Sequence, residues 1–154
     1  MTNSLEHLIA VQCELGENPL WGVGENAFYW TDIIGRCIYR YFPTSGKQER
    51  FETDVQVGCF AFRRKGGLVM GAKNGLAFWD FRDKKVDFLT RFDDIISPAR
   101  FNDGKVDRQG RFWAGAMSDL PENKLYRLDS AHRVAVMESG VTIANGLGWS
   151  PDDR

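Results

Sequence analysis

The stretch Gly104-Lys105-Val106-Asp107-Arg108-Gln109-Gly110-Arg111-Phe112-Trp113-Ala114 decides the fold of this 154-residue chain. Two short runs rich in apolar and aromatic residues flank a polar turn that contains Gln109-Gly110, a pattern typical of a β-hairpin. The same succession of apolar strand, polar turn and apolar strand recurs along the chain. Related units begin at Pro19-Leu20-Trp21, at Cys59-Phe60-Ala61-Phe62 and at Gly146-Leu147-Gly148-Trp149. Short strands joined by tight turns predict an all-β protein.

The spacing of these units indicates which all-β architecture they build. Their matching positions, separated by 41, 44 and 43 residues, are Trp21, Phe62, Val106 and Trp149. A repeat of about 40 to 45 residues is the length of one four-stranded propeller blade. A β-sandwich, the alternative fold, lacks such a repeat. We predict a β-propeller that comprises a lead-in strand at residues 1–14, blades near 15–56, 57–99 and 100–142, and the first strand of a further blade at 143–154.

Three blades and one strand are fewer than a closed propeller contains, since such rings hold about four to eight blades. An open arc leaves apolar faces and strand edges unpaired, which closed folds avoid. Residues 150–154, Ser-Pro-Asp-Asp-Arg, are typical of a turn inside a hairpin. We therefore expect a truncated fragment of a longer propeller, with self-association through the open sheet edges as the alternative.

Composition and charge argue against several classes of function. The 20 basic and 21 acidic residues give a net charge of −1 and form no basic stripe that would neutralise a nucleic-acid backbone. No apolar run approaches the roughly 18 residues of a membrane span. The first residues lack the features of a secretory signal, and the spacing of the three cysteines indicates free thiols. We expect a cytoplasmic protein that binds neither nucleic acid nor membrane.

Carboxylates and amides are better candidates for chemistry than histidines. Neither His7 nor His132 lies in a setting typical of a catalytic base, which disfavours a Ser-His-Asp triad. In a propeller, the loops that lead into the inner strands deliver side chains to the mouth of the central channel. Three such loops hold polar residues at comparable places, namely Glu17, Asn102 and Asn145, whereas the loop at 57–60 offers no such group.

One carboxylate and two amide oxygens suit a hard divalent cation, which prefers oxygen ligands. The alternative is structural, because Asn-Gly and Asn-Asp-Gly are ordinary turn sequences and Glu17 can be a solvated loop charge.

Five collinear stretches resemble the gluconolactonase/regucalcin family, also called the senescence-marker-protein and luciferin-regenerating-enzyme-like family. They are LGENPLW at 15–21, VGCFAF at 57–62, RFNDGKVD at 100–107, GRFWAGAM at 110–117 and ANGLGWSPD at 144–152. The resemblance runs through nearly the whole chain, in order and with fitting gaps. It implies a six-bladed propeller, about twice as long as this chain, that hydrolyses sugar lactones with one bound divalent cation.

The resemblance also implies which residues hold the cation. Glu17 and Asn145 resemble direct metal ligands, and Asn102 resembles a residue at both metal and substrate. The remaining ligand of the family, an aspartate on a later blade that is also its proposed general base, is expected beyond Arg154.

Further residues resemble substrate contacts. Arg100 corresponds to the residue that binds the sugar hydroxyls, with a structural ion pair to Asp103 or Asp107 as the alternative. Several members carry an acidic substrate contact after the Ala-Met segment, and here Asp119 or Glu122 stands in that place.

These observations predict metal-dependent hydrolysis of an aldonolactone to the open sugar acid. The partner is a small sugar lactone, and the cofactor is one divalent cation such as Ca, Zn, Mg, Mn or Fe. The cation would act as a Lewis acid on the lactone carbonyl, and a carboxylate would accept the proton of the attacking water. Two alternatives stay open: a broader lactone or phosphoester hydrolase, and a non-catalytic calcium-binding or interaction propeller.

Overall fold

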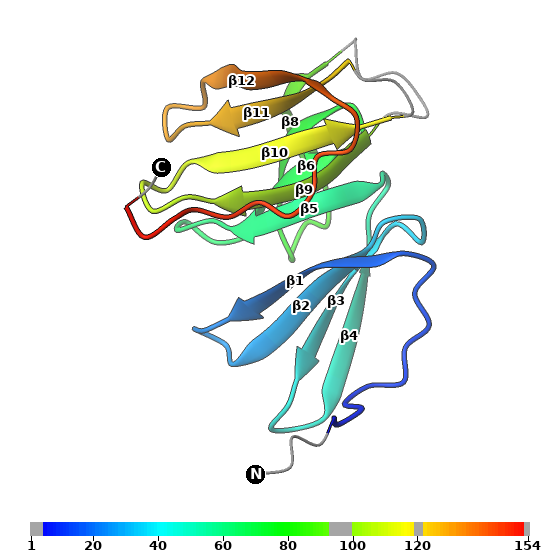
Figure 1. Ribbon diagram of the computed structural model, residues 1–154. Coiled ribbons are helices and arrows are strands. Elements are labelled where there is room, and N and C mark those ends of the chain that lie inside the picture. Colours follow the sequence, from blue (N-terminus) through cyan, green and yellow to red (C-terminus); the bar gives the residue numbers. More distant parts are fainter. Residues whose placement is uncertain (1–4, 93–99, 119–121, 153–154) are drawn as a thin grey trace.

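The computed structural model describes residues 5–92, 100–118 and 122–152. The strands of these residues form three four-stranded antiparallel sheets, each in chain order (Figure 1). The first sheet holds β1 (Gly16–Gly22), β2 (Ala27–Asp32), β3 (Cys37–Phe42) and β4 (Lys47–Glu52). The second holds β5 (Val57–Phe62), β6 (Leu68–Ala72), β7 (Gly75–Trp79) and β8 (Val86–Arg91). The third holds β9 (Arg100–Val106), β10 (Phe112–Met117), β11 (Asn123–Leu128) and β12 (Val134–Val141). The prediction of an all-β fold is confirmed.

The apolar core lies between the sheets. One cluster joins the first and second sheets and includes Tyr29, Ile38, Phe60, Met70 and Trp79. Another joins the second and third sheets and includes Cys59, Val69, Phe101, Phe112 and Tyr126. Side chains alternate between the two faces of a strand, so the middle sheet contributes to both clusters. Every residue of β6 is consequently buried.

The inner strands β1, β5 and β9 lie side by side, with β5 between the other two. Each carries a β-bulge near its start, between Glu17 and Leu20 in β1, between Val57 and Cys59 in β5, and opposite Gly115 and Ala116 in β9. A bulge bends its strand and re-aims the side chains beside it. The repeated bulges therefore turn one end of each inner strand into a place where side chains leave the regular pleat.

Gly58, in the bulge of β5, packs directly against the backbone of β9. A Cβ atom at this position would collide with the carbonyl group of Phe101 and lie 3.0 Å from the backbone nitrogen of Asn102. Glycine is thus required by the neighbouring backbone, since no flexible side chain is available to move aside. The contact sets the position of the strand that carries Arg100 and Asn102.

The start of β1 is fixed by the buried carboxylate of Asp32. This group accepts hydrogen bonds of 3.0 Å from the backbone N–H groups of Glu14, Leu15 and Gly35. Burial raises the pKa of Asp32, but the three N–H donors outweigh burial and hold the pKa below its ordinary value. Asp32 thereby orients the chain just before Glu17.

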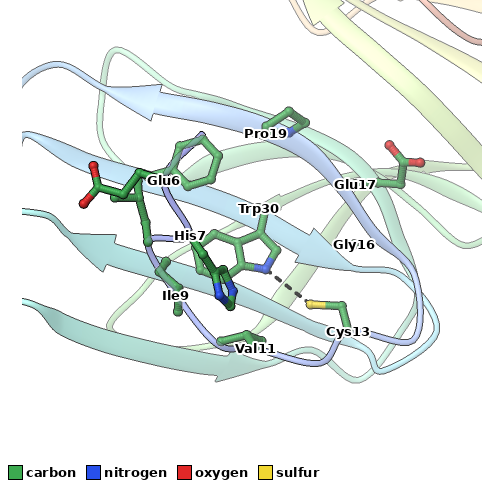
Figure 2. Close-up of a pocket in the computed structure, with 11 residues that line it drawn as sticks. Glu6, His7, Ile9, Val11, Cys13, Gly16, Glu17, Pro19 and Trp30 are labelled. Carbon is green, nitrogen blue, oxygen red and sulfur yellow. Dashed lines mark hydrogen bonds between the residues drawn. The ribbon is translucent and has the colours of Figure 1, made fainter. Parts of the chain in front are cut away.

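Residues 5–13 form no strand, in contrast to the expected lead-in strand at residues 1–14. This segment instead lies over the face of the first sheet that carries Phe28 and Trp30 (Figure 2). The indole N–H of Trp30 donates a hydrogen bond of 3.4 Å to the Sγ atom of Cys13. Side-chain packing on an aromatic face thus takes the place of backbone pairing. The three cysteines are free, as their spacing indicates.

In the described ranges, no helix is long and apolar enough to cross a membrane.

The replacement Gly58→Ala is expected to lower the free energy of unfolding by about 1–3 kcal/mol, because overpacking forces the backbone to shift. Chemical denaturation measures this change. Gly24→Ala is the matched control, since a Cβ atom there would meet nothing within 4 Å. Equal stabilities of the two variants would contradict the close approach of β5 and β9.

The replacement Asp32→Asn is expected to destabilise the chain at pH 7, because a neutral amide accepts the three N–H groups less strongly. A lowered folded-state pKa contributes stability above the ordinary aspartate pKa of 3.8, and this stability is lost as the pH falls through the lowered pKa. The difference in melting temperature between wild type and variant should therefore shrink as the pH falls below that value. A difference that stays constant over this range would contradict the role of the charge.

Candidate functional site

The candidate ligands occupy one repeated position, on the inner strands β1 and β9 and on the segment at residues 144–150. Each lies four residues before the apolar position that marks the repeat. Counted back from Trp21, Phe62, Val106 and Trp149, these residues are Glu17, Gly58, Asn102 and Asn145. In β1, β5 and β9, this position lies at or beside the bulge. This equivalence explains why the second repeat offers no ligand. Its equivalent residue is Gly58, whose lack of a side chain allows β9 to pack against β5.

Glu17 and Asn145 line the same cavity of about 470 Å³ between β1, β5, β9 and residues 145–147. Asp103 and Lys105 add charged groups to the wall, and Phe60 is among the apolar residues that complete it. The structure thus brings together the two residues that resemble direct metal ligands. We take this space as the candidate site.

A larger cavity of about 600 Å³ lies beneath the N-terminal segment (Figure 2). Its walls are largely apolar, with Glu6 and His7 on one side and Trp30 on the other. Glu17 borders this cavity too, but Figure 2 shows its carboxyl group directed away from Trp30 and Cys13. Of the candidate ligands it contains only Glu17, so the smaller space is the better site.

Arg100 and Asn102 form a connected pair on β9. The Nη1 group of Arg100 donates hydrogen bonds of 2.9 Å to the Oδ1 atom of Asn102 and to the Phe101 carbonyl oxygen. The Nδ2 group of Asn102 donates a hydrogen bond of 2.9 Å to the carbonyl oxygen of Ala144. The alternative ion pair between Arg100 and Asp103 or Asp107 is not observed in the described residues. Each of those carboxylates is bound to other groups.

Charge connects Arg100 to the cavity. Burial lowers the pKa of the Arg100 guanidinium, and the carboxylate of Glu17 acts in the opposite direction. The two charges are therefore close enough to interact, although they form no ion pair in the part of the chain that the structure describes. The Glu17 carboxylate also makes no hydrogen bond to a described residue, which leaves its oxygens available to a ligand.

The donor set fits a hard divalent cation in kind, because Glu17, Asn102 and Asn145 all offer oxygen atoms. The Oδ1 atom of Asn145 accepts only a 3.1 Å bond from the adjacent Gly146 N–H, so it has a free lone pair. The Oδ1 atom of Asn102 likewise has a second lone pair beside the one used by Arg100. Across the described residues, no three His, Cys, Asp or Glu side chains gather to hold a metal. The cation would thus depend on amide oxygens.

The acidic substrate contact predicted after the Ala-Met segment has no structural test here. Asp119 lies outside the described residues, and Glu122, the other candidate, is exposed.

Two residues next to the candidate ligands were not singled out by the sequence. The Nδ2 group of Asn18 donates a 3.1 Å hydrogen bond to the carbonyl oxygen of Phe60 on the neighbouring inner strand. The Oδ2 atom of Asp103 accepts bonds of 2.7 Å and 3.2 Å from the N–H groups of Gly146 and Leu147. One sequence feature could have indicated both residues, since each directly follows the repeated ligand position.

Known sequences resemble the chain over most of its length. A family model described as SMP-30/Gluconolactonase/LRE-like region matches residues 15–154. The 6-deoxy-6-sulfogluconolactonase of Pseudomonas putida is 34% identical over 155 residues, which cover 99% of this chain and 53% of that protein. The pentonolactonase of Haloferax volcanii is 35% identical over 153 residues, which cover 97% of this chain and 50% of that protein. The chain thus spans about half the length of these relatives.

A solved structure shows the same fold. Regucalcin from Agrobacterium tumefaciens, described as a calcium-binding protein, matches with a TM-score of 0.86 at 19% identity. The match covers 95% of this chain and 50% of that chain, and it confirms the propeller architecture. The sequence repeat, the three sheets and the family match lead to one conclusion: the chain belongs to the SMP-30/Gluconolactonase/LRE-like family.

Proposed function

We propose that the chain carries residues of a metal-dependent active site that hydrolyses sugar lactones. The observation that carries this proposal is the shared cavity of Glu17 and Asn145, next to the Arg100–Asn102 pair. Two relatives with more than 30% identity are named as lactonases, which supports lactone hydrolysis as the chemistry.

Glu17 and Asn145, which line one cavity, would hold the cation. Asn102, whose amide bonds the carbonyl oxygen of Ala144 next to Asn145, would supply a further oxygen donor. Glu17 supplies the negative charge and the two amides supply neutral oxygen donors. A divalent cation bound there supplies Lewis acidity toward a lactone carbonyl oxygen.

Arg100 is suited to orient the sugar. Its Nη1 group already uses its two protons on Phe101 and Asn102, so the Nε and Nη2 groups keep three N–H donors. Charge-assisted hydrogen bonds from these groups to ring hydroxyls would hold the lactone with its carbonyl at a fixed place. The bond to Asn102 couples the orientation of the sugar to the ligand position.

The proton acceptor of the reaction is not assigned to a carboxylate of the cavity. Glu17 is a candidate ligand, and both oxygens of Asp103 accept backbone hydrogen bonds. Asp103 is held against the backbone of residues 104, 146 and 147, so neither carboxylate takes the role of general base in this proposal.

The replacement Glu17→Gln is expected to lower Ca²⁺ or Mn²⁺ affinity and the rate of acid release from gluconolactone by at least about tenfold, since the only charged ligand is lost. Calorimetric titration measures the affinity, and a pH-stat assay with and without chelator measures the rate. Glu14→Gln, an exposed charge three residues away, is the matched control. Unchanged affinity and turnover in Glu17→Gln would overturn the metal site. Cation binding without acid release in the wild type would favour a non-catalytic metal-binding propeller.

The replacement Arg100→Lys is expected to raise KM for gluconolactone by about tenfold and to lower cation affinity by much less than Glu17→Gln does. A lysine keeps the charge near Glu17 but cannot bond Asn102, Phe101 and sugar hydroxyls in one plane. Steady-state kinetics measure KM, and Arg82→Lys, on an exposed turn, controls for the loss of a guanidinium. A KM equal to that of the wild type would contradict the assigned substrate contact.

A further inference from the structure

The segment that carries Asn145 runs beside β9 without joining its sheet (Figure 1). Residues 144–150 form no strand. Side chains of β9 hold this segment instead, through the bonds from Asn102 to Ala144 and from Asp103 to residues 146–147. The Nζ group of Lys105 adds a 3.3 Å bond to the carbonyl oxygen of Leu147. The position of Asn145 therefore depends on side chains of β9.

Asp103 makes the most direct of these contacts. Its Oδ2 atom accepts bonds from the two N–H groups that follow Asn145, and its Oδ1 atom accepts a 2.7 Å bond from the Gly104 N–H. Two successive N–H groups converge on one oxygen because Gly146 has a φ angle of 71°, a conformation that glycine adopts without strain. The carboxylate thus clamps the backbone immediately after the candidate ligand.

The residue equivalent to Asp103 in the first repeat also bonds the backbone of the neighbouring repeat. Asn18 lies in β1 where Asp103 lies in β9, and it bonds Phe60, the repeat equivalent of Leu147. In β1 an amide donates to a carbonyl oxygen, whereas in β9 a carboxylate accepts from N–H groups. Replacement of Asp103 by asparagine would therefore keep its shape and place an amide N–H₂ or a weaker acceptor against the two N–H groups.

We propose that Asp103 is a positioning residue that holds Asn145 in the cavity for cation binding. The inference rests on the proposed function in one respect, the role of Asn145 as a ligand. Asp103 acts through the backbone of residues 146–147, since each of its oxygens is already hydrogen-bonded. Its charge on the wall of the same cavity adds attraction for a cation.

The first experiment compares the wild type with Asp103→Asn by Ca²⁺ titration, amide hydrogen exchange and thermal unfolding. We expect a cation affinity at least about tenfold weaker, as for other groups that orient a ligand. Exchange should accelerate at Gly146 and Leu147 in the metal-free protein, while the melting temperature stays near that of the control Asp87→Asn, an exposed charge on β8. Unchanged affinity in Asp103→Asn, or loss of affinity only in step with global unfolding, would overturn the proposal.

A double-mutant cycle then tests whether Asp103 acts through Asn145. In an Asn145→Ala background, Asp103→Asn should weaken cation binding by clearly less than in the wild type. Full additivity would assign the effect of Asp103 to its charge alone and overturn its positioning role. Absence of cation binding by the wild type would instead reject the proposed function. In that case, faster exchange at Gly146 and Leu147 in Asp103→Asn would still establish the clamp, and unchanged exchange would remove it.

Discussion

β5 and β9 pack backbone against backbone at Gly58, where any side chain would strike the carbonyl group of Phe101. Both core clusters include residues of β5, so the middle sheet packs against the first sheet as well as the third. Cys59, next to Gly58, is completely buried, and burial raises the pKa of its thiol well above its ordinary value. Because β9 carries Arg100, Asn102 and Asp103, the placement of most of the candidate site follows from the missing side chain at Gly58.

Neither carboxylate that the sequence offers to Arg100 pairs with it in the described residues. Asp107 follows the end of β9 that lies farthest from Arg100, and it is buried and bound by Arg111, Trp113 and the N–H group of Gln109. Burial raises the pKa of Asp107, but these donors outweigh it and keep the pKa low. An aspartate saturated in this way has little to offer a further guanidinium. Arg100 instead donates a hydrogen bond to Asn102 and interacts electrostatically with the Glu17 carboxylate.

Periodicity made the sheets predictable, because each repeat carries its own turns and its own apolar strands. The same periodicity identified Glu17, Asn102 and Asn145 as equivalent positions, and two of them line one cavity. The expected lead-in strand does not form at residues 5–13. These residues contain enough apolar side chains for a strand, but they pack on the aromatic face that Phe28 and Trp30 present. Local sequence does not reveal which face is left uncovered.

The contacts of Asn18 and Asp103 were not predictable for a related reason. Each side chain satisfies a backbone group about 42 to 44 residues away, Asn18 on β5 and Asp103 on residues 146–147. Turn chemistry alone gives both residues an equally good local explanation. The sequence alone does not show which distant N–H or C=O groups lack a strand partner, because that depends on how the strands pair. The N–H groups of Gly146 and Leu147 are open to Asp103 because residues 144–150 form no strand.

The balance of charge shows what the described site requires from a ligand. Glu17 and Asp103 bring two carboxylates to the cavity wall and Lys105 brings one ammonium group, while the guanidinium of Arg100 acts against the charge of Glu17. Cation affinity rises with the number of charged ligands and with the rigidity of the site. With so little net charge, rigidity becomes the larger contribution, and here it comes from backbone clamps and from the approach of β5 to β9. A cation site of this kind is strongest when its neutral amide donors are held in place, which is the condition that the inner strands are built to meet.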